Sequence, residues 1–149
     1  ALFFKTVQNK LHYSVHGHTA SELIVGRADA TKDNMGLTSF KGAVVRKGDV
    51  DIAKNYLNED EITVLNRIIN MYLDYAEDQA LQHIPMYMSD WEKKLNDFLQ
   101  FTGRKVLQDA GSISAEFAKE KANREYELYD IKRKEADREM MICLIWQSV

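Results

Sequence analysis

Three of the four histidines of this chain lie in one short segment, from His12 to Asp29. His12 and His16 are four residues apart, and so are His18 and Glu22. On a helix, residues at this spacing share a face, which is how two side chains converge on one metal ion. Three imidazoles and one carboxylate are adequate ligands for zinc, manganese or iron. The segment is therefore the first candidate for a binding or catalytic site.

A single site at these residues requires an interruption of the helix at Gly17. On one continuous helix the two pairs would point roughly 150–200° apart. The segment also lacks the H-E-x-x-H pattern and the E-x-x-H pairs of di-iron bundles. The alternative, which we favour, is structural: His12 packs partly buried, His16 is solvent-exposed, and His18 bonds a backbone carbonyl near a helix start. No metal or cofactor is assigned.

Arg27 and the polar segment after it extend the candidate site. Arg27 could contact an anion or a phosphate beside the glycine-containing residues 31–42. The favoured alternative is that Arg27 satisfies the last carbonyls of a helix, with Asp29 capping the loop. A ligand pocket would lie under the loop 34–40 and combine six side chains: His12, His16, His18, Glu22, Arg27 and Asn34.

The other polar groups indicate structural roles. Asp74 and Asp78 share a helical face beside Glu77, and like charges at this spacing are unfavourable unless a divalent ion or a basic side chain offsets them. We expect a structural salt bridge there. Cys143 has no recognisable catalytic partner, and the sequence has no G-x-S-x-G elbow, P-loop or G-x-G-x-x-G motif. Whether the protein is an enzyme stays open.

Length and composition are those of one globular domain. The chain has 149 residues, of which 45% are hydrophobic and 29% charged. A net charge of −3 and a pI near 5.8 argue against a large nucleic-acid footprint. The single cysteine fits a reducing compartment, and there is neither a signal-peptide pattern nor an apolar run of the ~18–20 residues that a membrane span needs. We expect a cytoplasmic protein.

Apolar residues recur at helical spacing, and no segment alternates as a strand does. The sequence predicts an all-α, single-domain bundle of about five to six helices with one long ordered loop, residues 30–48. The first helix either breaks at Gly17 and restarts at the N-cap Thr19 or continues with a weak point. The further predicted helices span residues 49–57, 58 to about 85, 89–103, 104–111 and 114 to about 140.

The C-terminal helix has an inward face too sparse to be buried alone. That face comprises Ala118, Ala122, Tyr126, Tyr129, Ala136 and Met140, so the helix packs edge-on or pairs with a partner helix. Bulky apolar residues follow and should not stay in water: they fold back on the core, pack on another chain, or form a foreign or truncated tail. We divide the chain into a helical domain, residues 1–140, and an apolar tail of uncertain status, residues 141–149. Because Ala1 opens inside an apolar pattern, we expect further residues upstream.

Several blocks, taken in order, resemble the RhuM family of virulence-associated bacterial proteins. They cover most of residues 3–129 and include V-Q-N-K-L-H-Y-S-V-H-G-H-T-A-S-E-L-I, R-A-D-A-T-K-D-N-M-G-L-T-S-F-K-G, I-A-K-N-Y-L-N-E-D-E-I, L-N-R-I-I-N-M-Y-L-D-Y-A-E-D-Q-A and D-W-E-K-K-L-N-D-F-L-Q-F. The resemblance implies the C-terminal portion of a longer protein, whose N-terminal part resembles a DNA-binding, phage-antirepressor-like module. It implies no reaction. Some members of the family carry a label that links them to Fic-type nucleotide transferases, whose motif is H-x-F-x-[DE]-G-N-G-R. The nearest match here is residues 101–104, which lacks the catalytic histidine, the acid and the G-N pair.

Three functions are compatible with these observations. The first, which we favour, is a non-enzymatic interaction or oligomerisation domain that forms homo-oligomers or binds a protein partner. The second is a ligand- or metal-dependent enzyme domain, including a degenerate Fic-like nucleotide transferase, that uses the His/Glu/Arg pocket. The third is DNA contact by residues 132–134, although interleaved acids favour an ordinary solvated helix face there. Nucleic acid would otherwise be bound through the N-terminal module, and no membrane partner is expected.

Overall fold

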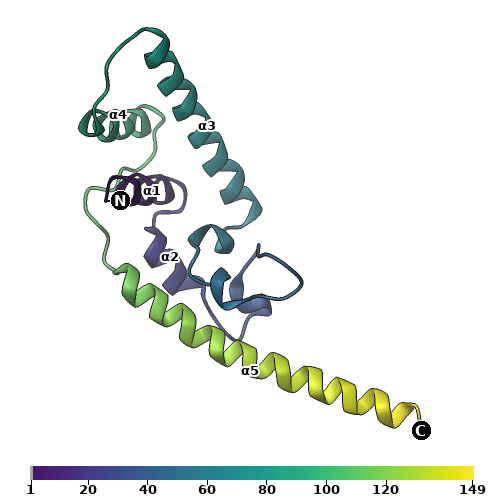
Figure 1. The fold of residues 1–149 in the computed structure, drawn as a ribbon. Helices are drawn as coiled ribbons and strands as arrows, with labels where there is room; N and C mark the ends of the chain where they lie inside the picture. The colour runs from purple at the N-terminus through teal and green to yellow at the C-terminus, as the bar shows by residue number, and fades with distance from the viewer. Residues whose placement is uncertain (1) are drawn as a thin grey trace.

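The computed structural model describes residues 2–149, in which all regular structure is helical (Figure 1). The all-α prediction is confirmed. The five α-helices are α1 (Leu2–His16), α2 (Ala20–Arg27), α3 (Glu59–Leu81), α4 (Met88–Phe101) and α5 (Ala115–Gln147). Three short 3-10 helices lie between α2 and α3: η1 (Asp33–Gly36), η2 (Lys47–Asp49) and η3 (Ala53–Tyr56). None of the helices in the described residues is long and apolar enough to cross a membrane.

The first two helices are separated at Gly17, one of the two possibilities left by the sequence. Gly17 has a φ of +79°, which ends α1 in a conformation that glycine adopts readily. Thr19 then caps α2, because its hydroxyl accepts a hydrogen bond from the Glu22 N–H at 3.3 Å. The Glu22 carboxylate accepts from the Thr19 N–H at 2.9 Å and completes the capping box. The break lets α2 leave the direction of α1.

Helices α1, α3 and α4 pack around one small core. Its centre is formed by Ile68 of α3 with Leu95 and Leu99 of α4, all fully buried. Helix α4 begins at Met88, one residue before the predicted start at Ser89. The reason is the capping bond: the Tyr87 N–H donates to the Asp90 carboxylate at 3.0 Å, in place of the expected pairing of Ser89 with Glu92.

A second core lies under the loop that joins α2 to α3. It contains Met35, Val45 and Val50 of the loop, which are buried against residues of α2, α3 and α5. The Tyr56 hydroxyl donates to the Val50 carbonyl at 2.6 Å, and the Thr38 N–H donates to the Asn55 carbonyl at 2.7 Å. Buried side chains and internal hydrogen bonds thus give this long loop a defined path, although its only helices are single 3-10 turns.

The predicted helix at residues 104–111 is absent, which corrects the sequence analysis. Residues 102–114 contain no helix. Gly103 leaves α4 with a φ of +76°, and the buried Lys10 ammonium of α1 then donates to the Leu107 carbonyl at 2.7 Å. This contact with a residue far away in the sequence holds the segment against α1 in a non-helical form, and local pattern alone gave no sign of it.

Helix α5 packs against α2 with its first half and leaves the rest of the molecule with its second half (Figure 1). Ala118 and Ala122 are buried, and the small side chains allow α5 to approach α2 closely. The Lys121 ammonium donates to the carbonyls of Val25 and Ala28 at the end of α2. Two expectations are corrected. Helix α5 runs on to Gln147, and both Ala136 and Met140 are exposed rather than inward, because all residues from 134 onward lie beyond the packed body.

Gly36 supplies a direct test of the loop structure. Its φ is +86°, and a Cβ atom at this position would overlap the Arg27 carbonyl oxygen. We expect Gly36→Ala to lower the free energy of unfolding by at least about 2 kcal/mol, from backbone strain and displaced packing. Chemical denaturation at pH 7 measures this value.

Gly26 is the matched control for that substitution. It lies within α2, has no positive φ, and nothing within 4 Å would meet a Cβ atom there. Gly26→Ala should therefore raise stability by roughly 0.5–1 kcal/mol, the ordinary gain in helix propensity. Equal effects of the two substitutions would contradict the loop path described above.

Candidate functional site

His12 and His16 form a hydrogen-bonded pair on the last turn of α1. His12 Nδ1 lies 3.1 Å from His16 Nε2, so one ring donates and the other accepts. His12 is buried and His16 half-buried, which differs from the solvent exposure expected for His16. The Nδ1 atom of His16 is itself buried and has no hydrogen-bond partner among residues 2–149. The pair is therefore a polar group enclosed within the fold, with one unused nitrogen.

Both rings are held in the neutral form. Burial lowers the pKa of His12, and burial together with the neighbouring His12 lowers the pKa of His16 to about 4. The nearby Glu61 carboxylate acts in the opposite direction on both rings but does not outweigh burial. At neutral pH the pair can bind a proton donor or a metal ion, but it carries no charge.

Arg27 forms a two-pronged ion pair with Glu61, at the start of α3. The two guanidinium nitrogens donate to the two carboxylate oxygens at 2.6 and 2.8 Å, and one of them also donates to the Tyr56 carbonyl at 2.9 Å. Hydrogen bonding to Arg27 lowers the pKa of Glu61 to about 2. The favoured prediction, that Arg27 binds the last carbonyls of α2, was wrong, because Lys121 binds them instead.

Glu22 and His18 lie on the other side of the break at Gly17. The Glu22 carboxylate accepts hydrogen bonds from the backbone N–H and hydroxyl of Ser112 at 2.9 and 3.0 Å, in addition to its capping bond. The Ser112 backbone bond is the largest cause that lowers the pKa of Glu22. The His18 side chain is 59% exposed, with Nδ1 4.0 Å from the Glu22 carboxylate.

The six predicted site residues therefore fall into separate groups. His12 and His16 lie together near the Arg27–Glu61 pair, whereas Glu22 binds Ser112 in the segment before α5 and His18 is exposed beside Glu22. His16 and His18 connect the groups, with ring centres 6.0 Å apart. Asn34 is exposed in η1, with a φ of 52°. Asp29 caps the loop as expected, since its carboxylate accepts from the N–H and hydroxyl of Thr31.

Comparison with known proteins gives one finding. The sequence matches the Virulence protein RhuM family over residues 1–137. The chain belongs to the RhuM family. This confirms the resemblance and extends it beyond the blocks that suggested it. No curated protein and no solved structure matches the chain.

Sequence reasoning missed the role of Glu61 in this RhuM chain. The spacing of Asn58 and Glu61 predicted a capping box, which is present, with bonds of 3.0 and 2.9 Å. The same carboxylate also receives Arg27, and no local pattern connects residues so far apart in the sequence. The predicted salt bridge at Asp74 and Asp78 was wrong: within residues 2–149 neither forms an ion pair, and Asp78 accepts from the Gln82 amide at 2.7 Å.

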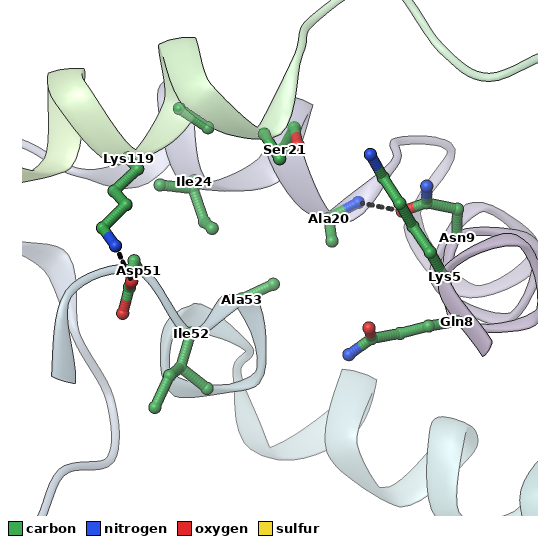
Figure 2. A pocket seen from close by; sticks show the side chains of 12 residues that line it. Lys5, Gln8, Asn9, Ala20, Ser21, Ile24, Asp51, Ile52, Ala53 and Lys119 are labelled. Atoms are coloured by element: carbon green, nitrogen blue, oxygen red, sulfur yellow. Dashed lines mark hydrogen bonds and ion pairs between the residues drawn. The ribbon is translucent and has the colours of Figure 1, made fainter. Parts of the chain in front are cut away.

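A hollow in the RhuM domain lies elsewhere, between α1, α2, η3 and the start of α5. It has a volume of about 410 Å³, and none of the six predicted site residues lines it. Figure 2 shows Lys5, Gln8 and Asn9 on one side, and on the other Asp51 and Lys119, which form an ion pair of 3.9 Å. Among residues 2–149 no group of three or more histidine, cysteine or acidic side chains could hold a metal ion.

The neutral histidine pair makes the stability of the domain depend on pH. Because the pKa of folded His16 is about 4 and that of an unfolded histidine about 6.5, the unfolded chain binds more protons between these values. The contribution of the neutral His16 to the free energy of unfolding is therefore largely present above pH 6.5 and is lost as the pH falls toward 4. Because the His16 ring is only half-buried, solvent screens part of this effect, and we expect a loss of about 1 kcal/mol between pH 7 and pH 5, measured by urea denaturation at each pH.

His16→Gln should remove most of this slope, because glutamine does not titrate. His18→Gln is the matched control, since His18 is exposed, and it should leave the slope as in the wild type. A wild-type protein with equal stability at pH 7 and pH 5 would contradict the neutral pair.

Proposed function

We propose that this RhuM domain is a non-enzymatic interaction and oligomerisation domain. In the virulence-associated protein it would accompany the N-terminal DNA-binding-like module that the family resemblance implies. The observation that supports the proposal is the exposed apolar surface of α5.

The second half of α5 carries more apolar surface than a helix alone in water should expose. Nine apolar side chains are exposed from the middle of the helix to the end of the chain: Leu128, Ile131, Met140, Met141, Ile142, Leu144, Ile145, Trp146 and Val149. Residues 140–149 include no charged side chain. Contiguous apolar surface of this kind marks protein–protein contact sites, and aromatic residues and methionine are enriched there.

The contacts of the predicted site residues also support an interaction domain. Arg27 is engaged by Glu61 and Tyr56, and Glu22 by Thr19 and Ser112, so both charged groups already hold parts of the fold together. A catalytic group needs a free face toward a substrate. These bonds favour a structural use of the two residues.

Sedimentation velocity over a range of concentrations tests the proposal. The wild-type chain should form a dimer or larger oligomer. The double substitution Ile142→Gln and Ile145→Gln should weaken association at least tenfold, because each buried isoleucine contributes about 1.5–3 kcal/mol. The proposal of oligomerisation would be contradicted if both the wild-type chain and the full-length protein were monomeric at all concentrations.

The matched control is Leu73→Gln on α3. Leu73 is also an exposed apolar side chain, but it lies in a different part of the molecule. This substitution should leave the sedimentation coefficient unchanged. Loss of association with Leu73→Gln alone would move the interface away from α5.

A ligand-binding function of the histidine pair is the second candidate. The separation of 3.1 Å between His12 Nδ1 and His16 Nε2 is compatible with two ligands on one metal ion, and both rings are neutral, as metal ligands must be. Among residues 2–149 no third ligating side chain is grouped with them, so water or a bound anion would have to complete the coordination.

A thermal-shift series with zinc, cobalt and nickel chlorides tests this second candidate. A metal at a hundred times its dissociation constant stabilises by about 2.7 kcal/mol, which should raise the melting temperature by roughly 5–10 °C. The shift should disappear in His16→Gln and persist in His18→Gln. Melting temperatures unchanged by all three metals would count against a metal site.

A further inference from the structure

Six positions of α5 form a straight seam on the side that the body of the molecule does not cover. They alternate in steps of three and four residues: Leu128, Ile131, Glu135, Arg138, Ile142 and Ile145. This is the spacing of the core positions of a two-stranded coiled coil. Leu128 and Ile131 are 53% and 55% exposed even where α5 still packs on the body, because the body contacts the face of Ala118 and Ala122.

The two charged positions at the middle of the seam determine how it can pair. Consider an antiparallel pair whose two-fold axis lies halfway between Glu135 and Arg138. Glu135 of each copy then faces Arg138 of the other copy. The same register places Ile131 opposite Ile142 and Leu128 opposite Ile145. Every position of the seam then meets a position of matching chemistry, apolar with apolar and acid with base.

A parallel pair lacks this match. It would place Glu135 on Glu135 and Arg138 on Arg138, and like charges facing each other in an interface are strongly unfavourable. The sequence of the seam therefore favours antiparallel pairing over parallel pairing.

The charges beside the seam follow the same register. Lys132 and Glu139 flank the seam, and the antiparallel arrangement brings Lys132 of each copy close to Glu139 of the other copy. Within residues 2–149, no ion pair involves Lys132, Glu135, Arg138 or Glu139. The ion pairs within the second half of α5 use other residues: Asp130, Arg133, Lys134 and Asp137.

The shape of the molecule leaves room for the second copy. The body covers only the first half of α5, and the second half projects into solvent (Figure 1). The segment Leu128–Ile145 is about 27 Å long at 1.5 Å per residue. Antiparallel pairing over this length places the body of the second copy beside the last turns of the first copy's α5, on the side that the seam leaves open, so the two bodies lie at opposite ends of the paired helices.

We propose that a second copy of this chain covers the seam, with the two α5 helices antiparallel through residues 128–145 and Glu135 of each copy opposite Arg138 of the other. The proposal rests on the proposed oligomerisation function and names its surface and geometry.

Charge reversal with recombination tests the register. Glu135→Arg alone places two arginines opposite each other, and Arg138→Glu alone places two glutamates opposite each other. Each variant should weaken the dimer at least about tenfold in sedimentation equilibrium. An equimolar mixture of the two variants should dimerise as the wild type does, because an acid again faces a base in both central layers. The double variant E135R/R138E should also dimerise.

The two substitutions should leave the fold itself intact. Both positions are exposed, and glutamate and arginine have similar helix propensities. Far-UV circular dichroism of each variant should match the wild type, and this makes a loss of association interpretable.

Cys143, the one cysteine of the chain and exposed on α5, gives a second readout. In the antiparallel dimer, position 143 of one copy lies level with position 130 of the other copy. Spin labels on the two Cys143 residues should therefore lie 13 residues, or about 20 Å, apart along the helices at 1.5 Å per residue. In a parallel pair they would be level and about 10 Å apart.

The possible failures are distinguishable. A monomeric wild type overturns both this pairing and the proposed oligomerisation. A dimer that neither charge reversal weakens overturns the pairing and leaves oligomerisation through another surface. Loss of the dimer in each variant without recovery in the mixture overturns the antiparallel register.

Discussion

The ion pair between Arg27 and Glu61 is the contact on which the arrangement of this domain depends most. It connects the last residue of α2 to the first turn of α3 and so closes the long loop between them. The same carboxylate caps α3 through Asn58, and the same guanidinium holds the Tyr56 carbonyl at the end of the loop. Because two parallel bonds fix the guanidinium plane, the pair sets an orientation as well as a distance.

The buried groups around this pair divide the domain into two connected cores. On one side the loop buries Met35, Val45 and Val50 against α2 and α5. On the other side α3 continues to Ile68 and packs with α4 against α1. The histidine pair at the end of α1 lies near the ion pair, so its neutral state follows from the packing that brings the helices together. The charged groups near the histidine pair, Arg27 and Glu61, are compensated by the hydrogen bonds between them.

What could be predicted from the sequence was local. The caps at Thr19 and Asn58 and the proximity of His12 to His16 follow from spacing within a few residues, and the break at Gly17 was one of the two possibilities that this spacing left. The sequence did not predict the contacts that join distant parts of the chain. These are Arg27 with Glu61, Lys121 with the end of α2, and Lys10 with Leu107. The last of these replaced a predicted helix. For the candidate site, spacing identified the residues, but their partners depend on tertiary packing that a periodic pattern does not contain.

Helix α5 contains neither glycine nor proline along its 33 residues. A helix without such residues bends only at the cost of its own hydrogen bonds. Its packed half, fixed to α2 through Ala118, Ala122 and Lys121, therefore turns together with its projecting half. A small rotation of the packed half about its contacts with α2 would therefore move the far end of α5 through a much larger distance.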